Sequence, residues 1–294
     1  MEGSVKISNG FVHASIETLG AELTELARIG GQNVLWQKDD VHWNRVAPNL
    51  FPIVGRLKND SYMIQGKQYS MTQHGFARDC RFMIEAQTDV SVTLLLTSDD
   101  TTCERYPFSF EFRVTFTLVD NGIQIEYSVK NTGQRDLPFS VGGHPGFALS
   151  DHLSNYELRF PEPLNIERHL LDGSYLSGRT ETMHIDVALT LSNELFKRDA
   201  IVFIEPPFKE LTLAHKEKGT LLKVSSDHWE ALGIWTKTGA PFLCIEPWWG
   251  YADRTDASGD LYCKSGIHHL KPGNGEGLSF SIELSDNETF QLKS

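Results

Sequence analysis

The chain has 294 residues, of which 40% are hydrophobic and 22% are charged. These fractions are typical of a soluble globular protein with a sizeable core, and they exclude a disordered or fibrous chain. The net charge is −12, from 27 basic and 39 acidic residues, and no lysine- or arginine-rich run occurs, so we expect no nucleic-acid partner.

We expect a cytoplasmic protein with no membrane partner. No segment approaches the roughly 20 consecutive apolar residues of a membrane helix, and Met1–Lys6 lacks the basic and apolar regions of a signal peptide. The four cysteines form no Cys-x-x-Cys pair, so they indicate neither a zinc ribbon nor a redox motif. We expect all four to be reduced thiols in the core: Cys80, Cys103, Cys244 and Cys263.

Along the first third of the chain, most apolar residues recur with the period of two that is typical of β-strands. Residues 5–7 and 11–16 flank Asn9-Gly10 and predict an opening hairpin. Residues 39–46 have helical spacing and could form one or two turns of helix. Residues 81–87 and 92–97 are predicted to pair as strands through a turn around Asp89.

The clearest hairpin lies in the middle of the chain. Apolar residues alternate from Phe108 to Leu118, Asp120-Asn121-Gly122 turns the chain, and alternation resumes over residues 123–129. Residues 278–284 repeat the pattern. With 24 glycines, 12 prolines and no linker or internal repeat, the sequence predicts an all-β class, in one antiparallel domain spanning residues 1–294.

Three segments place ionisable side chains among glycines and aromatic residues. They are Gly55-Arg56 with residues 73–78, the stretch 142–147 around His144, and the stretch 244–250 around Glu246. Glycine and proline next to His144 would hold its imidazole close to a ligand, and an unperturbed pKa of about 6.5 suits a proton donor. The alternative is a histidine that caps a turn.

Glu246 follows the apolar residues 241–245 and precedes Trp248 and Trp249. A carboxylate against aromatic faces loses hydration, which raises its pKa and makes it a stronger base. Alternatively, Glu246 forms a structural ion pair and the tryptophans fill the core. The pair His268-His269 is expected to belong to a loop.

Further polar side chains in the first segment could hold hydroxyl or anionic oxygens. His74, Arg56 and Arg78 offer directional hydrogen bonds, and each arginine can donate through a two-pronged fork. Structural ion pairs are the alternative for both arginines.

Together these segments resemble the aldose 1-epimerase (galactose mutarotase-like) family, in particular its short bacterial branch encoded near lactose-use genes. The motifs are Gly-Arg, His-Gly-Phe-x-Arg, Gly-His-Pro-Gly-Phe and Ile-Glu-Pro-Trp, in this order, and the similarity runs over nearly the whole chain. The resemblance implies a β supersandwich with a shallow sugar cleft, and an isomerase that interconverts the α and β anomers of an aldose without a cofactor or metal.

The resemblance also implies roles for individual residues. His144 would protonate the ring oxygen, and Glu246 would remove the proton of the anomeric hydroxyl, from opposite sides of the ring. His74 and Arg56 would bind sugar hydroxyls. Asp199, ahead of the apolar residues 201–203, is the positional match to an aspartate that holds hydroxyls; Arg78 and Trp248 complete the predicted substrate-binding set.

This sequence departs from galactose-specific members next to both catalytic positions. It has His-Pro-Gly-Phe where they have His-x-Tyr-Phe-Asn, and Pro-Trp-Trp follows Glu246 where they have Thr-Gln. The partner is therefore predicted only as a small-molecule sugar or sugar phosphate, and no sequence signal assigns an oligomeric state.

Four alternatives remain from the sequence. A hexose-6-phosphate 1-epimerase would use the arginines to hold phosphate, and a non-catalytic carbohydrate-binding protein would use the tryptophans as a stacking platform. A glycoside hydrolase would need a second carboxylate across the scissile bond. His74, His144 and Glu246 could instead hold a metal ion, although their spacing matches no local ligand motif.

Overall fold

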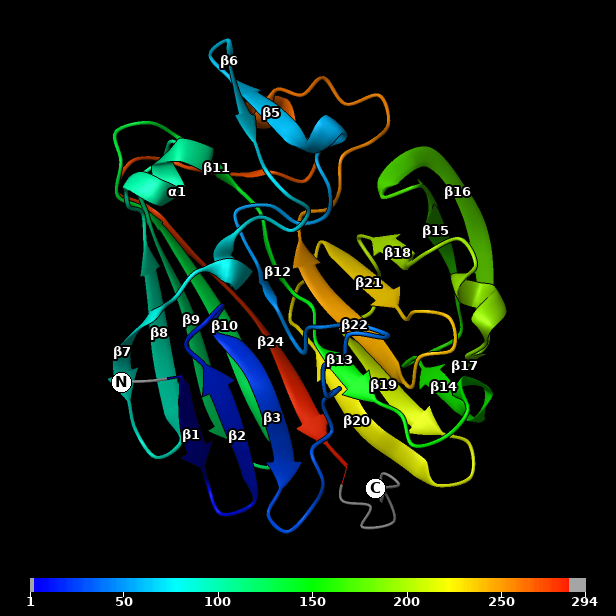
Figure 1. Ribbon diagram of the computed structural model, residues 1–294. Helices are drawn as coiled ribbons and strands as arrows, with labels where there is room; N and C mark the ends of the chain where they lie inside the picture. The colour runs from blue at the N-terminus through cyan, green and yellow to red at the C-terminus, as the bar shows by residue number, and fades with distance from the viewer. Residues whose placement is uncertain (1–2, 286–294) are drawn as a thin grey trace.

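The computed structural model describes residues 3–285 and confirms the all-β class (Figure 1). One large antiparallel sheet has nine strands, in the spatial order β17 (Ala188–Thr190), β14 (Tyr156–Arg159), β19 (Glu210–His215), β20 (Gly219–Ser225), β24 (Gly275–Leu284), β10 (Gly122–Asn131), β9 (Phe110–Val119), β8 (Ser91–Thr97) and β7 (Met83–Gln87).

The second large sheet has eight strands and carries the site described below. Its order is β16 (Tyr175–Ile185), β15 (Leu164–Asp172), β18 (Ile201–Ile204), β21 (Ala231–Trp235), β22 (Phe242–Trp249), β12 (Val141–Gly143) and β4 (Asn49–Leu50), and β13 (Gly146–Ala148) also pairs with β22.

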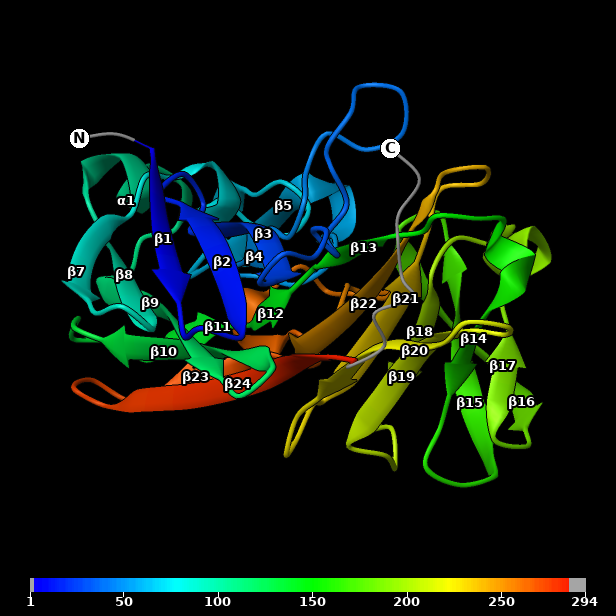
Figure 2. The same ribbon diagram turned by 90° about the horizontal axis from the view of Figure 1, so that it is seen from below.

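Smaller elements cover these sheets. A three-stranded sheet of β1 (Ser4–Ser8), β2 (Val12–Glu17) and β3 (Glu22–Arg28) lies over β8, β9 and β10 (Figures 1 and 2). Two further strand pairs are β5 (Ser61–Ile64) with β6 (Lys67–Ser70), and β11 (Leu137–Phe139) with β23 (His268–Leu270). The helix α1 spans Asp100–Arg105, and short 3-10 turns span Lys58–Asp60, Ala77–Asp79, Leu153–Asn155, Asn193–Phe196 and Leu261–Cys263.

The predicted hairpins are confirmed, and the period of two matches burial most clearly in β9, whereas all five residues of β7 are exposed. In β9 every second residue from Phe110 to Leu118 is buried, and β10 returns with Val119 opposite Gly122. The opening pair β1–β2 and the pair β7–β8 also form. Alternation places one face of each strand on the core and the other toward solvent.

The helix predicted over residues 39–46 is wrong. The Asp39 carboxylate accepts the His42 backbone N–H at 2.6 Å, and the Asp39 N–H donates to the Trp43 carbonyl at 3.0 Å. The indole N–H of Trp36 donates to the same carbonyl. These side-chain and loop-closing bonds replace the helical ladder, and they fold the segment into a loop beside the eight-stranded sheet.

All four cysteines are free thiols, but they do not share one environment. Cys244 is buried in β22, Cys80 and Cys103 are partly buried, and Cys263 is exposed. The expectation of core thiols therefore holds for Cys244 and is wrong for Cys263. Cys263 ends a 3-10 turn in a surface loop, which sequence hydrophobicity alone does not reveal.

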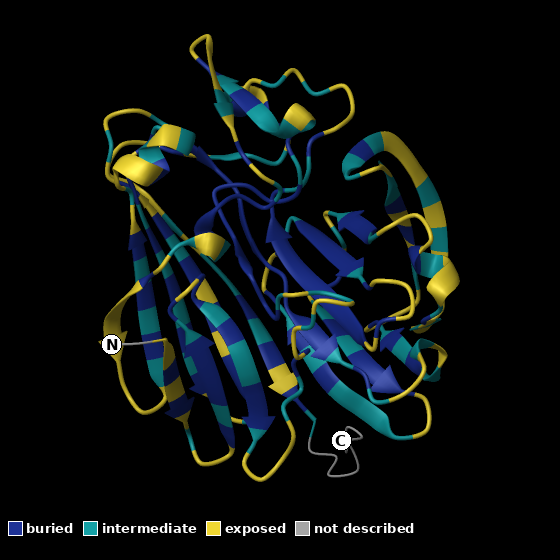
Figure 3. Ribbon diagram, viewed as in Figure 1, coloured by how far each residue is buried: buried dark blue, intermediate teal, exposed yellow. Residues whose placement is uncertain are grey.

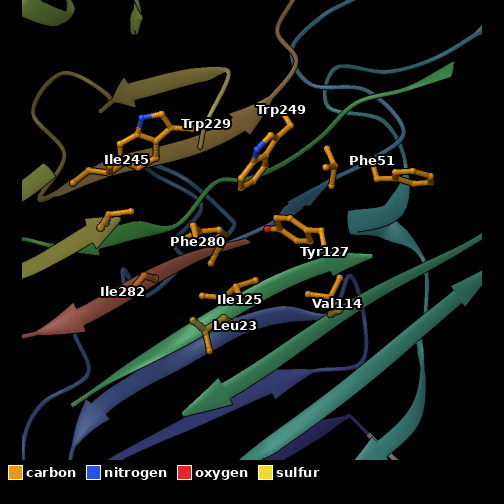
Figure 4. Close-up of a cluster of buried hydrophobic side chains, with 14 of the residues drawn as sticks. Leu23, Phe51, Val114, Ile125, Tyr127, Trp229, Ile245, Trp249, Phe280 and Ile282 are labelled. Atoms are coloured by element: carbon orange, nitrogen blue, oxygen red, sulfur yellow. The ribbon is translucent and has the colours of Figure 1, made fainter. Parts of the chain in front are cut away.

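The core lies between the two large sheets. Leu23 of β3, Val114 of β9, Ile125 of β10 and Ile282 of β24 face Ile245 and Trp249 of β22 across it (Figure 4). All eight residues of β22 are buried, as Figure 3 also shows. Because side chains alternate along a strand, β22 directs Ile245 and Trp249 to this core and directs Cys244 and Trp248 to the opposite face of the sheet.

His268 is not a loop residue as predicted but belongs to β23, where it lies between two carboxylates. Its Nε2 is 2.9 Å from Glu230 Oε1, and its Nδ1 is 3.1 Å from Glu276 Oε1. Burial alone would lower the pKa of His268, but hydrogen bonds to both carboxylates outweigh it and raise the pKa to about 9. The imidazolium therefore joins β23, β24 and the start of β21.

This histidine makes part of the stability depend on pH. Its folded-state pKa lies above the unfolded value of about 6.5, so the stabilisation is complete below about pH 6.5 and is lost as the pH rises through 9. We expect His268→Gln to lower the free energy of unfolding by on the order of 1–3 kcal/mol at pH 6 and by much less above pH 9. Urea denaturation of both proteins across this range measures the difference, and a cost that stays constant with pH would contradict the assignment.

Candidate active site

A cavity of about 320 Å³ opens on the face of the eight-stranded sheet that points away from the core. Leu171 of β15, Leu176 of β16 and Val202 of β18 form part of its wall. Its volume lies in the range of small-molecule sites. The structure brings six of the seven predicted site residues to this wall: His74, Arg78, His144, Asp199, Glu246 and Trp248.

Glu246 and His144 meet at the centre of the wall. Glu246 lies within β22, opposite Gly233 of β21, and not after the end of a strand as predicted from the sequence. His144 lies in the two-residue connection between β12 and β13. The Nε2 atom of His144 is 3.1 Å from Oε2 of Glu246, so the two groups lie side by side and not on opposite sides of a ring-sized gap.

Burial favours the neutral forms of both groups. Glu246 is 2% exposed and His144 is 9% exposed. Loss of hydration raises the pKa of Glu246 well above its usual range, and the negative charge of Asp199 adds to this effect. Loss of hydration also lowers the pKa of His144 to about 3. Burial therefore disfavours both the carboxylate form of Glu246 and the imidazolium form of His144.

His74 lies behind this pair in a fixed orientation. Its backbone has φ of 66°, in the left-handed region, and Gly75 follows with φ of 72°. A Cβ at Gly75 would lie 2.2 Å from the Phe51 carbonyl oxygen, so only glycine fits this turn. The Gly55 N–H donates to Nδ1 of His74 at 3.2 Å, which leaves the proton of the neutral ring on Nε2.

Aromatic rings surround the imidazole of His144. Trp43 stacks on His144 with ring centroids 4.9 Å apart, and Trp235 meets it edge-on at 6.0 Å. His74 packs against the same imidazole at 5.5 Å. A ring confined on three sides keeps its Nε2 directed at Glu246 without reorganisation.

Trp248 provides an apolar surface beside the pair. Its ring lies over Gly233, where a Cβ would come within 2.5 Å of the indole. Trp249 points to the opposite face of β22, into the core, and donates its N–H to the carbonyl of His228. The Trp-Trp dipeptide is thus divided, with Trp248 toward the cavity and Trp249 in the packed interior.

The two arginines differ in position. Arg56, predicted to bind sugar hydroxyls, is absent from the cavity wall as described over residues 3–285, and its guanidinium forms a two-pronged pair with Asp60 at 2.7 and 2.5 Å. Arg78 lines the cavity, and its Nη2 donates to the Gln73 carbonyl at 2.6 Å. Its buried Nε has no hydrogen-bond partner, and burial lowers the pKa of Arg78 to about 10.

Asp199 lies exposed at the rim of the cavity, just before β18. Its backbone has φ of 67°, and its carboxylate accepts the Ala200 N–H at 2.9 Å. This places a carboxylate at the cavity mouth, where it can accept from ligand hydroxyls.

Several cavity residues were not predicted from the sequence: Trp43, Gln73, Trp235 and Tyr251. Gln73 and Tyr251 lie next to the predicted motifs around His74 and Glu246, so their position in the sequence could have identified them as site residues. Trp43 lies in the loop predicted as helix, and Trp235 ends β21 with no motif around it. Only the tertiary arrangement brings these two indoles together, 5.9 Å apart.

The metal ligand set considered from the sequence is not the one that the structure groups. Cys244, rather than His74, joins His144 and Glu246, with one possible ligand atom from each residue lying within 4.8 Å of the others.

No helix described in residues 3–285 is long and apolar enough to span a membrane.

Comparison with known proteins supports the same interpretation as the cavity. A family model described as aldose 1-epimerase matches residues 3–274. The chain belongs to the aldose 1-epimerase family. The predicted family membership is therefore confirmed, and with it the assignment of the chain as a carbohydrate epimerase, an isomerase.

Relatives of this epimerase extend over nearly its whole length. The plasmid and chromosomal LacX proteins of Lactococcus lactis subsp. lactis are each 30% identical over 299 residues, covering 96% of this chain and 99% of the relative. A galactose mutarotase related enzyme from Lactobacillus acidophilus is 35% identical with a TM-score of 0.94, covering 99% of this chain and 100% of that one. A galactose mutarotase-like protein from Lactobacillus casei ATCC 334 is 29% identical with a TM-score of 0.90, covering 96% and 100%. The predicted galactose mutarotase-like β supersandwich is thereby confirmed.

Proposed function

We propose that this epimerase interconverts the α and β anomers of a free hexose, with His144 and Glu246 as its proton-transfer groups. The observation that carries the proposal is the contact of 3.1 Å between Nε2 of His144 and Oε2 of Glu246 at the cavity wall. Ring opening requires one proton to leave the hydroxyl on carbon 1 and one to reach the ring oxygen.

The side-by-side arrangement is compatible with this reaction. The anomeric hydroxyl oxygen and the ring oxygen are bonded to the same carbon, so a neighbouring base and acid can reach both. Glu246 would accept the hydroxyl proton while His144 donates to the ring oxygen, each within hydrogen-bond reach.

The proton balance of the reaction closes within the pair. Transfer of one proton from Glu246 to His144 would give the carboxylate and imidazolium that react with the closed sugar. Ring opening would then return a proton to Glu246 and remove one from His144, so the neutral pair that burial favours is regenerated.

The remaining wall would hold the sugar around this pair. The apolar face of a pyranose can pack on the ring of Trp248, and the Nε2–H of His74, the unpartnered Nε–H of Arg78 and the carboxylate of Asp199 can bind hydroxyls. After rotation about the bond between carbons 1 and 2, reversal of both proton transfers closes the ring as the other anomer.

A free sugar is favoured over a sugar phosphate by the charges on the wall. Arg78 shares the cavity wall with the carboxylate of Asp199, and the second predicted arginine, Arg56, is already neutralised by Asp60. A hexose 6-phosphate would bring two negative charges to a wall with little free positive charge.

A substrate panel followed by polarimetry tests the proposal. We expect the protein to accelerate the mutarotation of freshly dissolved α-galactose and α-glucose. Galactose is the first substrate to test because two solved relatives are described as galactose mutarotase related or galactose mutarotase-like. Faster reaction of glucose 6-phosphate than of glucose would establish the phosphosugar alternative. Sugar binding by calorimetry with no acceleration would establish a carbohydrate-binding protein and overturn the enzymatic roles.

A further inference from the structure

Directly behind the catalytic pair lies a buried thiol that the proposed reaction does not use. Cys244 precedes Glu246 by two positions in β22, so both side chains point to the same face of the sheet. Cys244 is fully buried, and its sulfur lies with a nitrogen of His144 and an oxygen of Glu246 in a group whose atoms are within 4.8 Å of one another.

This trio matches the ligands and dimensions of a zinc site. Zinc binds thiolate sulfur at about 2.3 Å, imidazole nitrogen at about 2.0–2.1 Å and carboxylate oxygen at about 2.0–2.2 Å. Ligand atoms around a tetrahedral ion are therefore about 3.3–3.7 Å apart. His144 and Glu246 already lie 3.1 Å apart, so the largest separation in the group must close by about 1–1.5 Å, which side-chain rotation can supply.

The Glu246 carboxylate also has unused bonding capacity. Its Oε2 is buried and makes no hydrogen bond, and it lies 3.1 Å from Nε2 of His144. Buried polar atoms are normally paired, so this oxygen is available to a ligand that reaches it. Both residues line the cavity, and an ion entering from there meets them first and Cys244 behind them.

We propose that Zn²⁺ binds His144, Cys244 and Glu246, with a fourth position left to water, and thereby inhibits the enzyme. The ion would occupy the lone pairs of Glu246 and His144 on which the transferred protons are held during anomer exchange. Zinc is thus an inhibitor of this site rather than a cofactor, and the inhibition rests on the proposed function, whereas the binding does not.

A titration with Co²⁺ tests binding without relying on activity. Cobalt replaces zinc in such sites and gives a near-ultraviolet charge-transfer band when a thiolate is bound. We expect one cobalt per chain with this band in the wild type and in Cys263→Ala, whose lost thiol is the exposed one, and no band in Cys244→Ala. Absence of the band in the wild type, or its persistence in Cys244→Ala, would overturn the site.

Inhibition of mutarotation provides the second measurement. Loss of an outer-shell partner already weakens metal binding by about 10–100-fold, so Cys244→Ala should raise the half-inhibitory zinc concentration at least about tenfold, with uninhibited activity retained. Cys244→Ser, close in size, should behave in the same way, and thermal unfolding checks that both variants are folded. Equal inhibition of the wild type and both variants would refute the role of Cys244. Cobalt binding by a protein without mutarotase activity would refute the proposed function alone.

Discussion

Replacement of Glu246 by glutamine is expected to lower kcat for anomer exchange by about 10²–10⁴-fold, because a positioned general base typically contributes this much. The amide has the shape of the carboxyl group but cannot accept the proton of the anomeric hydroxyl. Polarimetry at saturating sugar measures the loss. KM should change little, because the hydroxyl contacts proposed for His74, Arg78 and Asp199 would remain.

The stability of this variant separates a catalytic role from a structural one. Glu246 is buried and favours its neutral form, so a neutral amide of equal size should leave the melting temperature unchanged or raise it. The control is Glu157→Gln, which removes a strand carboxylate of β14 paired with Arg159 at 2.7 Å. Near wild-type activity in Glu246→Gln, or an equal loss in both variants, would remove Glu246 from the mechanism.

Truncation of His144 to alanine is the second change with a large expected effect, again about 10²–10⁴-fold in kcat. The imidazole lies between Trp43, Trp235 and His74, so its removal leaves a cavity of its own shape. Added imidazole should enter this cavity and restore part of the rate, as apolar ligands fill engineered cavities.

Rescue by imidazole distinguishes loss of a proton carrier from loss of packing. His13→Ala, in β2 and remote from the cavity, is the control and should keep its activity without responding to imidazole. A His144→Ala variant that retains most of its activity would refute the role of His144. A folded but inactive variant without rescue would show that the ring positions Glu246 rather than transferring a proton.

The predicted hairpins, which belong to the nine-stranded sheet and the opening three-stranded sheet, could be identified because their signals are local. Alternation from Phe110 to Leu118 and the turn at Asn121-Gly122 depend only on neighbours in the chain, and the β9–β10 hairpin follows from them. The loop containing Trp43 could not be predicted in the same way. Its apolar residues have helical spacing, but their partners belong to β13, β21 and β22, and tertiary contacts override the local pattern.

The site shows the same division between local and distant determinants. The motifs around His144 and Glu246 identify both residues, and six of the seven predicted residues lie on one cavity. Their side-by-side geometry depends on strand pairing between β12, β13 and β22, which the sequence does not display. Arg56 shows the limit of a motif, because a nearby aspartate, Asp60, determines where its guanidinium points.

The burial of β22 on both faces has a consequence for how this protein inactivates. The strand that bears Glu246 is at once a wall of the cavity and a central layer of the interior, so it cannot fray or detach locally as a surface loop can. Heat or denaturant can therefore separate His144 from Glu246 only by disrupting the interior as well, so we expect the site and cooperative folding to be lost in the same event.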